Sequence, residues 1–351
     1  MTKPRKLCMC ALIALCAAAL PSNTIAEEPT PIVATFSILS DMVSNIGGDL
    51  VTVTTLVGRN GDTHVYQPTP ADAKSVKQAR LMFTNGLEFE GWLDRLAEAA
   101  EFDGVTVVAT NGVELISMDE HHDEHDEEQH DTQEDAQGNE RNEKEDDHHD
   151  EPQDQEAEHD DGHNGKSSDE HHHGEFDPHG WLSLRNAIVY VDNIAASLAK
   201  LNPTSANTFY QNRADYVAKL EALDKEITEM MSSLPISART IVTSHDAFQY
   251  FGRDYGLTFI APQGLSTDSE ASAQDVAKMI KQIRAEGISA VFVENVADPR
   301  LLEQIASETG SSIGGQLYPG ALSETDGPAS TYLDLMRHNA STIAKALAAA
   351  N

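Results

Sequence analysis

The sequence predicts an α/β protein of two lobes, each with a mostly parallel sheet and flanking helices, joined by a long rigid helix. Short apolar runs rich in β-branched residues alternate with helical periodicity both before residue 119 and after residue 236. Such alternation is typical of parallel sheets covered by helices. Between the two blocks, residues 203–235 form one helical stretch. At 1.5 Å per residue it would be on the order of 45 Å long, which is enough to support both lobes.

Residues 1–26 are predicted to be a secretory signal peptide. Basic residues near the start are followed by an apolar stretch and by a small residue, Ala26, before the expected cleavage point. The apolar stretch is too short to favour a transmembrane anchor. All three cysteines lie within it, and Cys16 follows Leu15, where a lipoprotein would have a small residue before its cysteine. We therefore expect a soluble, exported protein without disulfides.

The N-terminal lobe is expected to cover residues 27–118. It opens with a branched apolar run that reads as a strand, followed by a helical pattern that stops at Gly47 and Gly48. The elements predicted in this lobe are strands at 32–39, 51–58, 79–86 and 105–111, with helices near 42–47, from 71 onward and at 92–100.

Residues 119–175 interrupt the alternation with an insert of acids and histidines. It holds 25 acidic residues against Arg141, Lys144 and Lys166, so it supplies most of the formal net charge of −34. With almost no residue suited to a core, it is predicted to be a disordered loop when metal-free. The rest of the chain is mildly acidic and has no basic patch, which argues against nucleic-acid binding.

The second half of the chain is divided in three. Residues 176–202 are expected to complete the N-terminal lobe with a helix at 182–201, and 203–235 to form the linking helix. The C-terminal lobe would occupy residues 236–351. Its predicted elements are strands within 240–248, 257–264 and 290–295, a helix through 276–283 and a last helix at 331–350.

Three histidines outside the insert are the candidate metal ligands. His64, His179 and His245 lie in loops that adjoin predicted strands and helices. Three neutral imidazoles at one point would suit zinc and leave a fourth position open. Spacing alone does not bring them together, because they are far apart in the chain. Three unrelated histidines are the alternative.

The residues around these histidines resemble a known family. GDTHVYQPTPAD around His64, DPHGWLS around His179 and SHDAFQYF around His245 are similar, in this order, to ligand segments of the ZnuA-type zinc-uptake proteins. These are the periplasmic substrate-binding proteins of ABC transporters. Within the first segment the matching residues are His64, Tyr66, Pro68, Pro70 and Asp72, and within the second His179 and Trp181.

The resemblance implies two bridged α/β lobes, capture of Zn²⁺ in the periplasm and its delivery to a membrane permease served by a cytoplasmic ATPase. It also bears on the metal, because manganese- and iron-binding relatives usually have glutamate where this chain has His245. The aspartate that many relatives supply as fourth ligand would fall at Gly320. Water or the insert is then preferred as the fourth ligand over Glu324 or Asp326.

Other functions remain open at this point. The alternatives are a periplasmic zinc buffer or metallochaperone, the same fold tuned for manganese, and a zinc-dependent hydrolase. The hydrolase is the least favoured, because the sequence has no HExxH or G-x-S-x-G motif. We expect a monomer, not an enzyme, that carries zinc as its cargo.

Four further residues receive structural interpretations. Trp92 and Trp181 are predicted to be core residues, and His338 a surface or helix-packing residue. Glu294 ends a strand, where it would accept backbone hydrogen bonds or orient a ligand histidine.

The insert is predicted to be an accessory to the three-histidine site. Eleven of the fifteen histidines lie between His121 and His173, only a few residues before His179. Clustered imidazoles and carboxylates form many weak zinc sites, and a loop tethered there would raise the local zinc concentration. We expect it to collect zinc or to sense zinc sufficiency.

Overall fold

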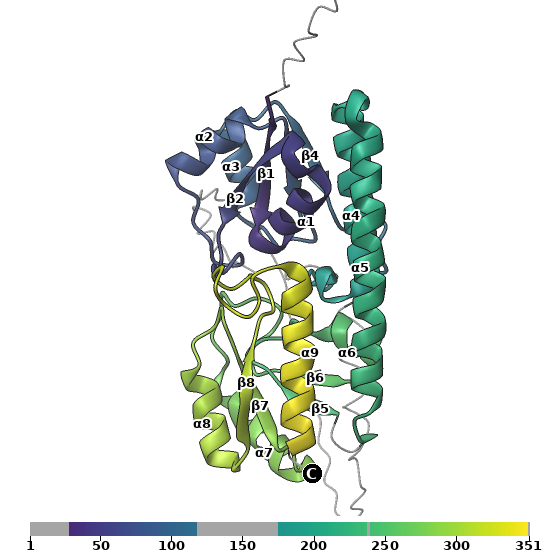
Figure 1. Ribbon diagram of the computed structural model, residues 1–351. Helices are drawn as coiled ribbons and strands as arrows, with labels where there is room; N and C mark the ends of the chain where they lie inside the picture. Colours follow the sequence, from purple (N-terminus) through teal and green to yellow (C-terminus); the bar gives the residue numbers. More distant parts are fainter. Residues whose placement is uncertain (1–27, 118–174, 237–238, 350–351) are drawn as a thin grey trace, which may run out of the picture.

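The computed structural model describes residues 28–117, 175–236 and 239–349. It confirms the predicted fold class: two α/β lobes lie one above the other, with helices packed beside both (Figure 1). The predicted signal peptide and nearly all of the insert lie outside the described residues.

The sheet of the N-terminal lobe has four parallel strands in the order β2-β1-β3-β4. The last five residues of β1 are buried, which explains its run of apolar and β-branched residues. The strands are β1 (Thr30–Phe36), β2 (Val51–Val57), β3 (Leu81–Thr84) and β4 (Val105–Val108).

Helices cover this sheet and continue into the C-terminal half of the chain. Among them, α2 begins with Pro70 at its first position and with a reciprocal capping box between Thr69 and Asp72. The helices are α1 (Ser37–Gly47), α2 (Pro70–Gln78), α3 (Leu93–Ala99) and α4 (Leu184–Leu201), with short 3₁₀ turns at Gly48–Leu50 and Gly180–Leu182.

The C-terminal lobe repeats this plan with parallel strands in the order β6-β5-β7-β8. Three of its elements, α6, α8 and β8, are not among those predicted from the sequence. The strand β8 contains Gly314 and Gly315 and is mostly exposed or half-buried, so it lacks the apolar alternation that marks a strand. The elements are β5 (Thr240–Val242), α6 (Gln249–Tyr255), β6 (Thr258–Ile260), α7 (Ala273–Glu286), β7 (Ala290–Glu294), α8 (Arg300–Thr309), β8 (Ser312–Leu317) and α9 (Tyr332–Ala349).

The long helix α5 (Ala206–Ser232) runs beside both lobes (Figure 1). It follows a 3₁₀ turn at Pro203–Ser205 and has 27 residues, slightly fewer than the 203–235 predicted. It packs against α1 and α4 on one side of the lobe boundary and against α6 and α9 on the other. Its predicted apolar positions are all buried, namely Tyr216, Leu220, Leu223 and Ile227.

One hydrophobic core is continuous across the lobe boundary. It joins β1 and α1 of the first lobe, helices α4 and α5, and α9 of the second lobe, while a smaller core lies between β7, α7 and α8. Trp92 and Trp181 belong to the large core with 3% and 0% exposure, as predicted. The two lobes are therefore packed together by apolar contacts as well as linked by the chain.

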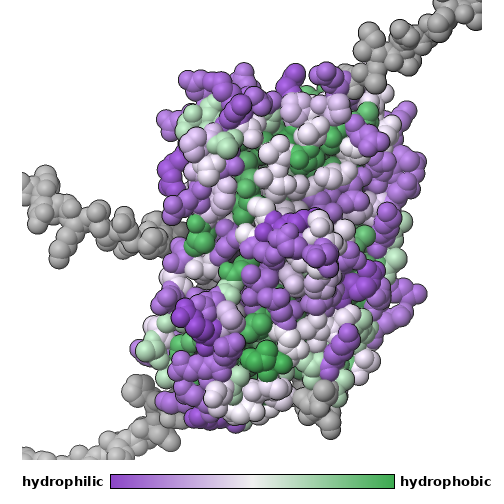
Figure 2. All heavy atoms as spheres, turned by 60° about the vertical axis from the view of Figure 1, so that its left-hand side comes forward, coloured by the Kyte–Doolittle hydropathy of each residue, from purple (hydrophilic) through white to green (hydrophobic). Residues whose placement is uncertain are grey.

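Hydrophilic residues predominate on the face shown in Figure 2, and its apolar surface is divided into separate areas. Within the described residues, no helix has both the length and the apolar character needed to cross a membrane.

Candidate metal site

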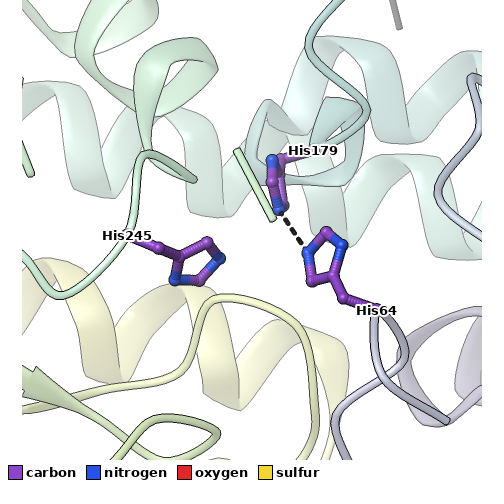
Figure 3. A group of neighbouring side chains, drawn as sticks. All are labelled: His64, His179 and His245. Carbon is purple, nitrogen blue, oxygen red and sulfur yellow. Dashed lines mark hydrogen bonds between the residues drawn. The ribbon is translucent and has the colours of Figure 1, made fainter. Parts of the chain in front are cut away.

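The three predicted histidines converge at the boundary between the lobes (Figure 3). His64 lies in the loop between β2 and α2, His179 lies just before the 3₁₀ turn that leads to α4, and His245 follows β5. One ring nitrogen from each lies within 4.8 Å of the other two. The Nε2 atoms of His64 and His179 are 3.3 Å apart. The cluster therefore has the dimensions of a site for a single ion.

The three histidines differ in their access to solvent. His179 and His245 are buried, with 0% and 1% exposure, whereas His64 is half-buried. His64 also borders a cleft of about 690 Å³, whose walls include Glu90 of the first lobe and Leu265 of the second. His64 is thus the histidine on the open side of the cluster.

Carboxylates hold the two buried rings from behind. The Nδ1 atom of His179 lies 2.8 Å from Oδ1 of Asp177, and the Nδ1 atom of His245 lies 2.5 Å from Oε2 of Glu294. Glu294 also accepts the backbone N–H groups of Ser244 and His245, so both roles considered for it from the sequence are present. With Nδ1 engaged, each ring is oriented to present Nε2 as its metal-binding atom.

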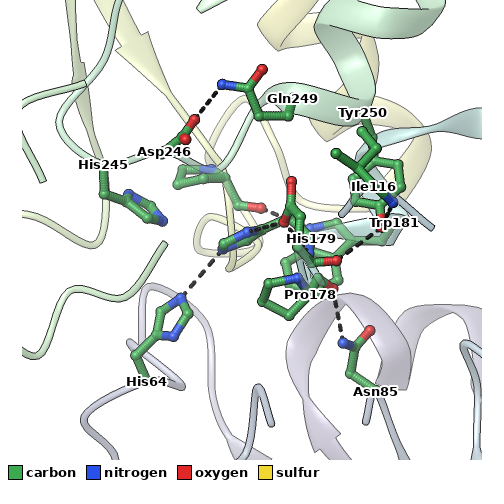
Figure 4. Close-up of polar contacts among 12 residues, drawn as sticks. His64, Asn85, Ile116, Pro178, His179, Trp181, His245, Asp246, Gln249 and Tyr250 are labelled. Atoms are coloured by element: carbon green, nitrogen blue, oxygen red, sulfur yellow. Dashed lines mark hydrogen bonds and ion pairs between the residues drawn. The ribbon is translucent and has the colours of Figure 1, made fainter. Parts of the chain in front are cut away.

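Asp177 was not identified from the sequence. Its oxygen Oδ1 also accepts the backbone N–H of His179 at 2.8 Å, and its own carbonyl accepts the Tyr250 hydroxyl. The carbonyl of Pro178 accepts a hydrogen bond from the side chain of Asn85 (Figure 4). The signal was present in the sequence as an aspartate two residues before the histidine, a spacing at which a side chain can accept the N–H of its own turn.

Local hydrogen bonds explain the sequence motif that follows His64. The Tyr66 hydroxyl donates to Asp72, whose carboxylate also caps α2 together with Thr69. On the other side, the indole of Trp92 donates to the carbonyl of Thr63 at 2.8 Å. These bonds fix both ends of the segment around His64 to the N-terminal lobe.

The pKa values of the three rings are shifted in different directions. Burial, followed by the proximity of the other two histidines, places the pKa of His64 well below its ordinary value. Burial and then His245 do the same to the pKa of His179. For His245, burial is the largest influence and acts downward, but the charge and hydrogen bond of Glu294, together with the charges of Asp62 and Asp246, raise the pKa overall. Without a metal ion, His245 is therefore the ring that best retains a proton.

The described residues contribute no carboxylate to the three-histidine group. Glu324 and Asp326 are exposed, and Glu324 accepts a hydrogen bond from Asn60. A Cβ atom added at Gly320 would meet no heavy atom within 4 Å, so this position leaves open space where relatives are expected to have aspartate. The fourth ligand stays a prediction, with water or the insert preferred.

His338 does not join the cluster. Its ring packs against Tyr318, and its Nε2 atom lies 3.0 Å from the carbonyl oxygen of Gln316. This agrees with its prediction as a surface or helix-packing residue outside the metal site.

The described residues that flank the insert lie side by side. Ser117 and Phe176 form an isolated antiparallel bridge, and Phe176 borders the same cleft as His64. The described chain on either side of the insert is thus paired next to this cleft.

Comparison of the sequence with known proteins identifies one matching family and several metal-binding relatives. A family model described as ZnuA, the periplasmic zinc-uptake complex component A, matches residues 32–346. The iron-binding protein YfeA of Yersinia pestis is 29% identical over 325 residues, which cover 93% of this chain and 88% of that protein. The manganese-binding lipoprotein MntA of Bacillus subtilis (strain 168) is 31% identical over 328 residues, with coverage of 92% and 91%.

Solved structures of metal-binding proteins are also similar to this chain. The periplasmic zinc-binding protein TroA of Treponema pallidum has a TM-score of 0.73 at 26% identity, covering 91% of this chain and 99% of that chain. The manganese-bound periplasmic metal-binding protein of Candidatus Liberibacter asiaticus has a TM-score of 0.69 at 28% identity, with the same coverage. The names of these relatives include zinc, manganese and iron.

Proposed function

Because the chain belongs to the family of the zinc-uptake complex component A, we propose that it captures Zn²⁺ through His64, His179 and His245 for import. Members of this family are extracytoplasmic, non-enzymatic, metal-binding components of ABC importers, which work with a permease and an ATPase. The proposal adds the identity of the ion, its ligands and a periplasmic location after removal of residues 1–26.

The donor set is the observation that carries the choice of zinc. Three imidazoles without a carboxylate in the described cluster suit zinc better than manganese, which prefers oxygen ligands. Two imidazole nitrogens each 2.0–2.1 Å from a tetrahedral zinc ion would be about 3.3–3.4 Å apart. The separation of 3.3 Å between the Nε2 atoms of His64 and His179 fits that geometry.

The charges around the cluster also suit a divalent cation. The carboxylates of Asp177 and Glu294 contact two of the three rings from the side away from the ion. Their two negative charges balance a doubly charged ion that is held by neutral imidazoles. Binding would displace the proton that Glu294 helps His245 to retain.

We further propose that the insert collects zinc for this site. Ser117 and Phe176, which flank the insert, are bridged to each other, and Phe176 borders the cleft that reaches His64. Replacing residues 118–175 by an Asn-Gly turn should leave one tight zinc site and remove the weaker ones. Loss of the tight site in that variant would contradict this division of roles.

A growth experiment tests the transport function. A strain without the protein should grow poorly in zinc-depleted medium, and added zinc, rather than manganese or iron, should restore growth. Genes encoding His64→Ala, His179→Ala or His245→Ala should fail to complement, whereas His338→Ala, outside the cluster, should complement fully. Rescue by manganese instead would indicate a manganese importer, and normal growth without the protein would favour a zinc buffer.

The zinc affinity of purified variants provides a second test of the same three ligands. Removing one of three imidazole ligands should weaken zinc binding at least about hundredfold, since losing even an outer partner typically costs 10–100-fold. In the His245→Glu variant, the ratio of zinc affinity to manganese affinity should fall, because the substitution introduces an oxygen donor.

A further inference from the structure

The loop that carries His64 is attached to both lobes. It joins β2 to α2 of the N-terminal lobe, yet several of its residues bond to the C-terminal lobe. The Arg59 guanidinium donates to the carbonyl of Ser323 at 2.6 Å, and the backbone N–H of Asn60 donates to the carbonyl of Leu322 at 2.9 Å. His64 therefore lies at a junction whose position depends on both lobes.

His64 and His179 have the same local hydrogen bond to an aspartate two residues earlier, but the two aspartates differ in their other contacts. Asp62 accepts the backbone N–H of His64 at 3.0 Å, just as Asp177 accepts that of His179. Asp177 uses the same oxygen to hold the ring of His179. Asp62 instead directs its second oxygen across the lobe boundary, where Oδ2 accepts the hydroxyl of Thr267 at 2.5 Å.

Thr267 is in turn attached to the segment of His245. Its loop follows β6 and runs alongside the residues after β5, where His245 bridges Gln263 and the N–H of Asp246 donates to Gly264. Hydrogen bonds therefore lead from His64 through Asp62 to Thr267. Thr267 lies three positions after Gly264, which bonds to the backbone beside His245. This path spans the lobe boundary next to the cluster.

We propose that the hydrogen bond between Thr267 and Asp62 is a latch that keeps His64 in register with His245 and slows metal release. Asp62 and Thr267 are then positioning residues, which act through the two histidines. The inference rests on the proposed function, because it requires His64 and His245 to hold the same ion. An ion bound from both lobes leaves when one ligand moves away, and His64 is the ligand on the open side.

The latch has the chemistry needed for this role. A hydroxyl that donates to a carboxylate makes a short, charge-assisted bond, which is stronger than a bond between neutral groups. Thr267 is half-buried, so water replaces the bond only in part when it is lost. Within the described residues, the other hydrogen bonds of this loop to the C-terminal lobe involve Arg59 and Asn60 and go to residues that follow β7 and β8.

Zinc release from the full chain tests the latch. Zinc-loaded protein is mixed with excess chromophoric chelator, and the slow phase reports the tight site. Thr267→Val removes the hydroxyl with little change in shape, and release should become about tenfold faster, the lower end expected for a lost hydrogen bond to a charged group. Thr267→Ser should release zinc at the wild-type rate. Thr258→Val, at an exposed threonine of β6, is the matched control.

The double variant identifies the partner. Asp62→Ala should release zinc faster, since it removes the bond to Thr267 and also the acceptor of the His64 N–H. Adding Thr267→Val to it should have no further effect, because the bond between the two residues is already lost. Any one of three results would overturn the latch: zinc release at the wild-type rate from Thr267→Val, fast release from Thr267→Ser, or additive effects on the release rate in the double variant. A wild-type chain without a tight zinc site would refute the proposed function itself, which separates the two failures.

Discussion

At the scale of the residue, the three histidines share one ion site but have different electrostatic surroundings. The rings of His179 and His245 are each backed by a carboxylate, whereas His64 meets the aromatic edge of Phe89 and the open cleft. Only His245 has a pKa raised by its surroundings, because burial is outweighed by Glu294 and nearby aspartates. His64 and His179, with lowered pKa values, are already neutral near pH 7.

This asymmetry predicts how many protons zinc displaces. At pH 6.5 the site should release between about half a proton and one proton per zinc ion, because the raised pKa of His245 keeps more than half of that ring protonated while His64 and His179, with lowered pKa values, are mostly neutral. Zinc affinity should therefore rise about tenfold per pH unit up to the pKa of His245 and level off above it. At lower pH, where His64 and His179 also become protonated, the dependence should steepen.

Calorimetry in buffers of different ionisation enthalpy measures this number. The variant with residues 118–175 replaced by Asn-Gly is the suitable protein, since it lacks the histidines of the insert. Glu294→Gln is the informative comparison, because without the carboxylate His245 should lose its proton at lower pH and the proton count should fall. Release of two or three protons at pH 6.5 by the parent would contradict the assigned protonation states.

At the scale of the element, the metal ligands could be predicted where the residues of the surrounding motif also form the local structure. The motif after His64 is visible because Pro70, Asp72 and Tyr66 build and brace the start of α2. In contrast, β8 was not predicted, since its glycines and exposed positions carry no strand pattern. The bond between Asp62 and Thr267 joins residues 205 positions apart and depends on how the lobes pack, which no local pattern encodes.

The helix α5 is the element that limits movement between the lobes. It is continuous from Ala206 to Ser232 and packs on helices of both lobes. Bending it would break backbone hydrogen bonds and expose buried side chains such as Leu220 and Leu223. We expect zinc binding to leave the radius of gyration of the Asn-Gly variant unchanged within error. Small-angle scattering of the metal-free and loaded forms measures it, and a clear contraction would show that α5 does not restrain closure.

At the scale of the whole molecule, the site depends on packing that both lobes share. One hydrophobic core runs from β1 through α4 and α5 to α9, and the histidines come from loops on both sides of the boundary. Neither lobe alone contains all three rings, since His64 and His245 belong to different lobes. An ion bound at this boundary would contact residues of both lobes. Its binding can therefore affect the surface of both lobes, which suits a protein that works with a permease.

The most direct test of the central claim is a crystal structure of the zinc-loaded protein with anomalous data collected on both sides of the zinc absorption edge. We predict one strong anomalous peak among the three rings, about 2.0–2.1 Å from the Nε2 atoms of His64, His179 and His245. Absence of a peak there while zinc occupies another tight site, or coordination that omits one of these histidines, would contradict the account.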